Sequence, residues 1–373
     1  MAALQIGIAG AGLLGRLLAW QLGGAGHAVT VFDPADGPQQ RGAAGWTAAG
    51  MLSPWAELES GDAEVAALGW RSIALWADIV HRLPQPVDLR CDGSLLLAHR
   101  ADLGAAQRLV GLLRARMPEG QAPQPLLAEA LAALEPAVHG PGHAWLLEGE
   151  GRIHSVQAMA ALADGATRRG VRWCWGRRVD ALGPGRIGEQ RFDWVFDVRG
   201  LGARPTALAC AAEGFTPQPG AGDAGFTAQL RGVRGEIVWL HAPGLVLNRP
   251  LRLLHPRWRV YLVPRRDDIV VVGASEIESE DRSPVSVRTL LGLLSAAHSV
   301  LPELAEARLV HSETNLRPAL PDNLPRTTVE PGLVRINGLF RHGWLVAPAL
   351  VQDALARAGL ASAAARPAQA CPA

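Results

Sequence analysis

The first forty residues alternate between short apolar runs and glycine-rich turns, a pattern that predicts one βαβ unit. Leu4 to Ala9 is an apolar run typical of a short buried strand. Leu13 to Leu22 carries an apolar stripe at helical spacing, and a cluster of glycines ends it. Ala28 to Phe32 repeats the strand pattern and closes on Asp33. This order of elements is typical of an open α/β sheet.

The rest of the chain predicts a second region and a return to the first sheet. The expected elements are a strand at 92–99, amphipathic helices at 102–117, 126–136 and 281–304, a helix followed by a strand at 154–175, and a C-terminal helix at 350–360. From 361 onward the tail has low complexity and is expected to be disordered.

Three glycines between the first strand and helix, Gly10, Gly12 and Gly15, form the pattern GxGxxG. The first allows a tight turn, the second lets backbone approach a pyrophosphate, and the third lets helix and strand pack closely. The helix N-terminus adds unpaired N–H groups and the positive end of a dipole. Asp33 lies where an acid binds ribose hydroxyls, which disfavours NADP; its alternative is a surface turn acid. FAD and NAD both use such a unit, so the motif leaves the choice between them open.

Composition narrows the class of protein. The chain has 373 residues, 49% of them hydrophobic and 19% charged, which predicts a soluble globular protein with a large core. Its net charge of +1 gives no basic field to recruit nucleic acid. All 36 cationic side chains are arginine, so no lysine can act as a base or form a Schiff base. The four cysteines show neither a CxxC pair nor metal-ligand spacing, and no metal is expected.

The apolar N-terminus lacks a basic region, is interrupted by glycines and contains Arg16. We therefore expect neither a secretory leader nor a membrane segment, and the cytoplasm as the location.

The segment Gly45 to Ser60, GWTAAGMLSPWAELES, is small and turn-rich, with Thr47, Ala48, Ala49 and Gly50 in succession. A nicotinamide dehydrogenase would usually return at once to another βα unit. These small residues instead favour a loop whose backbone lies close against a flat ligand group.

One arginine stands in the proline-rich stretch TNLRPALPDNLP. Arg317 precedes Pro318, so it sits on stiffened backbone among apolar residues. A guanidinium held in this way needs an anion, since an unpaired buried charge is costly. That anion is either a carboxylate ligand or a structural partner such as Asp322.

From about residue 4 to about residue 358, the chain resembles the D-amino-acid oxidase family of FAD-dependent oxidoreductases, and most specifically its glycine oxidase branch. The segments that carry this resemblance are TAAGMLSPWAE, the pair VYLVPR and VVVGAS, NLRPALPDNLP, and GLFRHGWLVAPAL. It implies an α/β fold: a Rossmann-like FAD-binding domain of the GR2 type, with a second α+β substrate domain on a mostly antiparallel sheet. The implied division is 1–82, 150–222 and 316–360 for FAD, and 83–149 and 223–315 for substrate.

The resemblance also implies a site. Arg317 and Tyr261 would bind the substrate carboxylate, with Arg341 and His342 beside the flavin ring and the entrance. The implied FAD contacts are Gly10, Gly12, Leu13, Leu14, Gly15, Asp33, Thr47, Ala48, Ala49, Gly50, Met51, Gly200, Gly338, Arg341, His342, Gly343, Trp344 and Leu345. From the residues alone, alternatives stay open: Tyr261 as a half-buried sheet residue, Arg341 as a surface cation that caps a helix, and His342 as a packing residue.

Some positions depart from the family pattern. Asp197 and Arg199 stand where small neutral residues are usual, and His342 replaces a common asparagine. No cysteine lies near residues 315 to 345, so FAD is expected to be bound non-covalently. The lysine that related sarcosine oxidases place beside the flavin is absent, which leaves the reaction with oxygen open.

The resemblance implies oxidation of the C–N bond of a small amino acid or secondary amine of the glycine, sarcosine or D-amino-acid type. Hydride would pass to flavin N5, and water would hydrolyse the resulting imine. The alternatives are a flavin-dependent dehydrogenase of a different or larger substrate, the flavin half of a nucleic-acid-modifying system, and an NAD-linked dehydrogenase. Expected partners are a carboxylate-bearing amine and O2 or another electron acceptor, with no nucleic acid; a homo-oligomer is left open.

Overall fold

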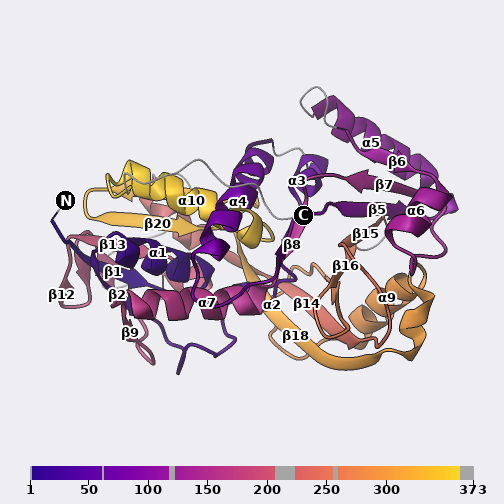
Figure 1. The fold of residues 1–373 in the computed structure, drawn as a ribbon. Helices are drawn as coiled ribbons and strands as arrows, with labels where there is room; N and C mark the ends of the chain where they lie inside the picture. Colours follow the sequence, from indigo (N-terminus) through magenta and orange to yellow (C-terminus); the bar gives the residue numbers. More distant parts are fainter. Residues whose placement is uncertain (1, 61–62, 117–121, 206–222, 255–258, 362–373) are drawn as a thin grey trace.

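The computed structural model describes residues 2–60, 63–116, 122–205, 223–254 and 259–361. Two large sheets lie side by side along the molecule, each with helices packed against it (Figure 1). The predicted disordered tail falls almost entirely outside the described residues, as does the end of the 150–222 segment of the predicted FAD domain. The division into domains stays a prediction.

The first sheet has six strands in the order β19-β20-β13-β1-β2-β9. Its strands are β1 (Gln5–Ala9), β2 (Ala28–Phe32), β9 (Arg172–Cys174), β13 (Trp194–Asp197), β19 (Arg326–Glu330) and β20 (Leu333–Asn337). All neighbours run parallel except β19, which is antiparallel to β20. Ile6 and Ile8 are fully buried because helices or loops cover both faces of a parallel sheet. The predicted βαβ unit is confirmed.

Four long helices accompany this sheet: α1 (Leu13–Gly24), α4 (Ala63–His81), α7 (Ser155–Arg168) and α10 (Gly343–Arg357). The C-terminal helix begins at Gly343, so the predicted start at residue 350 was wrong. Pro348 caused the error, because proline inside a helix removes one N–H donor. Here the loss is compensated: the carbonyl oxygen of Trp344, which Pro348 cannot use, accepts a 2.8 Å hydrogen bond from Trp76 Nε1.

The second sheet has eight strands in the order β18-β14-β17-β16-β15-β5-β7-β6. Its strands are β5 (Ser94–Ala98), β6 (Gln124–Leu126), β7 (His143–Leu147), β14 (Arg231–His241), β15 (Leu251–Leu254), β16 (Arg259–Pro264), β17 (Ile269–Gly273) and β18 (Arg308–Ala319). Every pair is antiparallel except β15 with β5. The predicted fold class, a Rossmann-like sheet beside a mostly antiparallel sheet, is confirmed.

Alternation along the strands gives the second sheet two different faces. Val260 and Leu262 of β16 point to a core that also contains Leu293 of α9 (Val287–His298). Tyr261 and Val263, the residues between and beyond them, point to the opposite face. That opposite face lines the cavity described below. The described part of this half also contains the helices α5 (Leu103–Arg116) and α6 (Ala128–Leu134).

Short elements complete the fold, and the small sheet β10-β11-β12 lies against β1 and β13 of the first sheet. One small sheet has the order β3-β8-β4 and another the order β10-β11-β12. Their strands are β3 (Met51–Leu52), β4 (Leu89–Arg90), β8 (Gly151–Ile153), β10 (Leu182–Gly183), β11 (Arg186–Ile187) and β12 (Gln190–Arg191); the short helices α2 (Ala44–Thr47) and α3 (Pro54–Ser60) flank β3.

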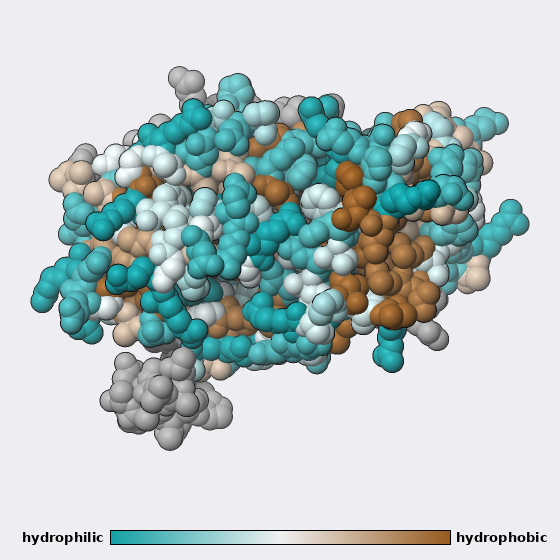
Figure 2. All heavy atoms as spheres, turned by 90° about the horizontal axis from the view of Figure 1, so that it is seen from below, coloured by the Kyte–Doolittle hydropathy of each residue, from teal (hydrophilic) through white to brown (hydrophobic). Residues whose placement is uncertain are grey.

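Apolar side chains gather on the surface at the end of the molecule that holds α9 and β18 (Figure 2). Val287 and Leu291 of α9, and Leu309 and Val310 of β18, are about half exposed or more. Among the described residues, no helix is both long and apolar enough to cross a membrane.

Candidate active site

A cavity of about 1070 Å³ extends from the turn after β1 to the second sheet. This volume lies just above the ~300–1000 Å³ range of small-molecule sites, as expected for a site that holds a large ligand. Most of the predicted site residues line it: Gly10, Gly12, Leu13, Leu14, Asp33, Thr47, Ala48, Ala49, Gly50, Met51, Gly200, Tyr261, Arg317, Arg341, Gly343, Trp344 and Leu345. Three predicted residues, Gly15, Gly338 and His342, lie outside the lining.

The three motif glycines have different surroundings. Gly10 has φ +107°, and a Cβ there would lie 2.6 Å from the carbonyl oxygen of Val198. A Cβ on Gly15 would collide with the carbonyl oxygen of Gly10, so both positions require glycine for the protein's own packing. A Cβ on Gly12 would meet only Ala43, at an ordinary 3.5 Å. Gly12 therefore faces open cavity, at the start of a helix that has no capping side chain.

Asp33 lies at the same end of the cavity. Its Oδ2 accepts a 2.6 Å hydrogen bond from the N–H of Ala11, and its Oδ1 accepts one of 2.9 Å from Ala35. The carboxylate is thus held against the glycine-rich turn and lines the cavity, whereas the alternative placed it in a surface turn. Its contact with ribose remains a prediction.

Arg16 organises the loops around this end, a role that the sequence reasoning missed. It is buried in α1 and donates to three backbone oxygens at 2.8 Å: Nε to Ala11, Nη1 to Met159 and Nη2 to Pro38. Burial lowers its pKa to about 10, against the opposing effect of the nearby Asp33 carboxylate. The available signal was a lone arginine inside an apolar helical stripe.

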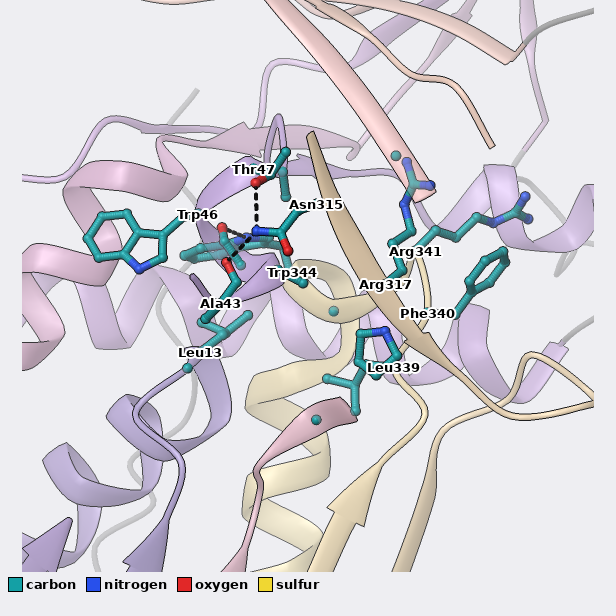
Figure 3. Close-up of a pocket in the computed structure, with 18 of the residues that line it drawn as sticks. Leu13, Ala43, Trp46, Thr47, Asn315, Arg317, Leu339, Phe340, Arg341 and Trp344 are labelled. Carbon is teal, nitrogen blue, oxygen red and sulfur yellow. Dashed lines mark hydrogen bonds between the residues drawn. The ribbon is translucent and has the colours of Figure 1, made fainter. Parts of the chain in front are cut away.

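The segment Thr47–Met51 is held from two sides. Gly50 has φ +70°, its carbonyl oxygen accepts a 2.8 Å hydrogen bond from Ile153, and a Cβ at this glycine would collide with Ile153. From the other side, Asn315 Nδ2 donates to Thr47 Oγ1 at 3.1 Å and to the carbonyl oxygen of Ala43 at 3.3 Å (Figure 3). The sequence analysis did not select Asn315. It stands two residues before Arg317 and so lies on the same face of β18, and this spacing could have identified it.

Arg317 and Tyr261 reach the cavity over two glycines of the second sheet. A Cβ on Gly235 of β14 would lie 2.5 Å from Arg317 Cζ, and a Cβ on Gly273 of β17 would lie 2.6 Å from the Tyr261 hydroxyl oxygen. Both side chains therefore lie flat across neighbouring strands. Neither glycine was singled out from the sequence, because only strand register shows what each one faces.

The guanidinium of Arg317 has donors to spare. Nη1 donates to the carbonyl oxygens of Arg234 and Ser275 at 3.3 and 3.1 Å, and Nη2 donates to Ser275 at 3.1 Å. A guanidinium has five N–H donors, so Nε–H and one N–H of Nη2 remain on one edge. Two parallel donors on one edge match a carboxylate.

The alternative partner, Asp322, is engaged elsewhere: it accepts from Arg326 and from the N–H of Leu324. Within the described parts of the chain, no carboxylate forms an ion pair with Arg317. Burial lowers the pKa of Arg317, while Tyr261 and Glu276 oppose this and Arg341 adds to it. Burial raises the pKa of Tyr261, despite the nearby cations of Arg317 and Arg265, so its hydroxyl keeps its proton at neutral pH and can donate.

Arg341 lies in the same part of the cavity as Arg317 (Figure 3). Its Nη2 lies 3.3 Å from Glu57 Oε2, so it is a paired group in the wall, whereas the alternative made it a surface cation. His342 is buried behind this wall, with Nδ1 2.9 Å from the same Glu57 oxygen. Burial by itself raises the pKa of Glu57, but His342 and Arg341 lower it below its usual range. Glu57 thus presents a carboxylate to the cavity that the sequence reasoning missed.

Other features were missed or left open. Further charged side chains line the same end of the cavity: Glu59, Arg252, Arg259 and Glu276. Asp197 and Arg199, the departures from the family pattern, pair with each other through two hydrogen bonds of 2.8 and 2.9 Å.

In the parts of the chain that the structure covers, no cluster of His, Cys, Asp or Glu could hold a metal ion.

The cavity suits FAD in shape and in chemistry. Helix α1 and Gly12 offer an uncapped N-terminus for a pyrophosphate, and Asp33 lies beside it. The small residues of Thr47–Met51 form a wall further along, and the free edge of Arg317 lies beyond that wall.

Comparisons with known proteins agree with this fit. The family model of FAD dependent oxidoreductases, DAO, matches residues 5–356. A protein of Rhizobium etli that carries the name thiamine biosynthesis oxidoreductase ThiO is 37% identical over 355 residues, which cover 95% of this chain and 96% of that protein. A glycine oxidase of Geobacillus kaustophilus is 24% identical over 365 residues, covering 92% and 90%.

The crystal structure of glycine oxidase from Geobacillus kaustophilus has the same fold, with a TM-score of 0.78, 22% identity and coverage of 98% of this chain and 96% of that one. The family match spans nearly the whole chain, and it includes both ends of the cavity. The chain therefore belongs to the DAO family of FAD-dependent oxidoreductases, is homologous to ThiO and glycine oxidase, and uses FAD as its cofactor.

Proposed function

We propose that this enzyme oxidises the C–N bond of glycine or a similarly small amino acid or secondary amine, with the substrate carboxylate bound to Arg317. The observation that carries the proposal is the free guanidinium edge of Arg317 in the cavity wall, with the Tyr261 hydroxyl nearby. The names of the relatives, ThiO and glycine oxidase, favour glycine as the first substrate to test.

The two residues would orient the substrate. Arg317 Nε and Nη2 would donate to the two carboxylate oxygens, and the Tyr261 hydroxyl would donate to one of them. FAD supplies the acceptor for the hydride that leaves the substrate α-carbon. The protein's share is positioning, which contributes most where reacting atoms need to be aligned and water excluded.

The packing around Arg317 and Tyr261 favours a small substrate. Arg317 and Tyr261 lie flat only because Gly235 and Gly273 carry no side chain. Arg341 and Glu57 close the same region as a hydrogen-bonded pair, and both are buried for the most part. A bulky substituent on the substrate would have to displace this pair.

Several finer points belong to the same proposal. FAD would be held without a covalent link, since no cysteine occurs between residues 315 and 345. The electron acceptor would be O2 or another oxidant. The cytoplasm is the proposed location, and the FAD contacts are the cavity-lining residues predicted above.

The test is the visible spectrum of the purified enzyme before and after anaerobic addition of glycine, sarcosine or a D-amino acid. Bleaching of the flavin bands by one of them would establish reaction and substrate together. A flavin that none of them bleaches would overturn the proposed substrate class while leaving the family intact.

A further inference from the structure

Arg265 is a buried cation behind the segment Thr47–Met51. It follows β16, and only 8% of its surface is exposed. Its Nη2 donates to the carbonyl oxygen of Ala49, while Nε and Nη1 are buried with no hydrogen-bond partner among the described residues. A guanidinium that is buried and only partly satisfied destabilises the fold by itself, so packing alone does not explain it.

No carboxylate of the described residues is in ion-pair contact with Arg265, and Asp88 acts on it only at longer range. Arg152 and Tyr261 also act on it. Burial lowers its pKa to about 9, which still leaves it protonated at pH 7. Ala49 and Tyr261 both line the cavity, so a positive charge is fixed just behind the cavity wall.

We propose that Arg265 is a positioning residue for FAD. Through Ala49 it fixes the wall beside the cofactor ring, and its charge stabilises the ring when the ring becomes electron-rich. This proposal takes one assumption from the proposed function, namely that the flavin ring lies beside Thr47–Met51. A cation in a site that excludes water interacts with such charge more strongly than one in solvent. Since the chain contains no lysine, arginine and histidine are the side chains that can supply such a charge.

Sulfite binding to the oxidised holoenzyme tests the role of the charge without turnover. Sulfite adds to the flavin ring as an anion and leaves the ring with negative charge, and the absorbance change gives a dissociation constant. Arg265→Met should weaken sulfite binding at least about tenfold, and Arg265→Lys should restore it to within about threefold. Arg266→Met is the matched control, because Arg266 is the exposed neighbour, and it should leave binding unchanged.

The flavin midpoint potential of each variant, measured in parallel, should be more negative in Arg265→Met and close to the unchanged value in Arg265→Lys. The proposal is overturned if Arg265→Met matches the unchanged enzyme, or if Arg265→Lys loses as much as Arg265→Met. Sulfite affinity and midpoint potential can be measured even if no amine substrate is oxidised. A negative result for Arg265 is therefore distinguishable from failure of the proposed function.

Arg265→Gln keeps a donor toward Ala49 without the charge and takes the place of Arg265→Met should that variant lose FAD. If both neutral variants lose FAD and Arg265→Lys keeps it, the charge is required, as proposed. If all three lose FAD, the residue is structural and the proposal is wrong.

Discussion

The two ends of the cavity are built in different ways. At the end near Gly12, the cavity is lined by backbone of one turn and the start of α1, with the Asp33 carboxylate held against that turn. At the end near Arg317, side chains meet from β18 and β16, over glycines of β14 and β17. The first end depends on consecutive residues, and the second depends on the register between strands that are far apart in the sequence.

This difference predicts what each end tolerates. The Gly12 end should respond to changes that fill space or remove the Asp33 carboxylate, and such changes should alter the affinity for FAD. The Arg317 end should respond to loss of charge or loss of room, and such changes should alter the affinity for substrate while FAD stays bound.

The largest effect is expected at Arg317. Arg317→Ala should lower kcat/KM for the amine substrate by roughly 100- to 4000-fold, since loss of one member of a buried charged pair costs about 3–5 kcal/mol. The flavin spectrum and FAD affinity should be unchanged. Steady-state kinetics would check this, with Arg326→Ala as the control, because Arg326 is more exposed and pairs with Asp322.

Asp33 should give the next largest effect, at the other end. Asp33→Ala removes the predicted acceptor of the ribose hydroxyls and should weaken FAD binding about tenfold or more, since hydrogen bonds to a charged group contribute about 1.5–3 kcal/mol. It also removes the acceptor of two backbone hydrogen bonds that hold the turn. With saturating FAD, the KM for substrate should not change. Equilibrium FAD titration would measure this, with the exposed Asp36→Ala as the control; equal affinities in the two variants would argue against a role of Asp33 in binding.

Gly273→Ala should affect the substrate end alone. The new Cβ would lie 2.6 Å from the Tyr261 hydroxyl oxygen, and displacing a packed side chain costs about 1–3 kcal/mol. We expect the KM for substrate to rise about tenfold, with FAD affinity unchanged. Gly111→Ala, on open helix surface, is the matched control. A KM that stays the same in Gly273→Ala would mean that Tyr261 does not contact substrate.

The same contrast explains what could be predicted from the sequence. The βαβ unit, Asp33 and the stiffened Arg317 are local patterns. The βαβ unit was found, and Asp33 and Arg317 line the cavity, while their ligand contacts stay predictions. Gly235, Gly273 and Glu57 carry no local signal, because their importance comes from residues that the sheets and α3 bring to them. Helix α10 was placed too late because the sequence does not show that Trp76 compensates for Pro348.

The smallest expected effect concerns Glu150, behind the Arg317 end. This residue is fully buried, and burial raises its pKa to about 7, against the lowering effects of Arg252 and of hydrogen bonds from Ser94 and Trp55. Its pKa is higher in the folded than in the unfolded chain, so it contributes a loss of stability as pH rises from about 4.5 to about 7.

Glu150→Gln does not titrate, so its Tm relative to the unchanged enzyme should rise by a few degrees between pH 5 and pH 8. Glu148→Gln, an exposed neighbour, is the control for this thermal series. A difference in Tm that stays constant with pH would show that Glu150 ionises normally.

Binding of a carboxylate beside FAD at Arg317 is tested most directly with glycolate, which has the carboxylate of glycine without its amine. Titration of the oxidised enzyme with glycolate should perturb the flavin spectrum to saturation, and Arg317→Ala should abolish this response at the same concentrations. A glycolate affinity that is the same in both proteins would contradict the assignment of Arg317 as the carboxylate-binding residue.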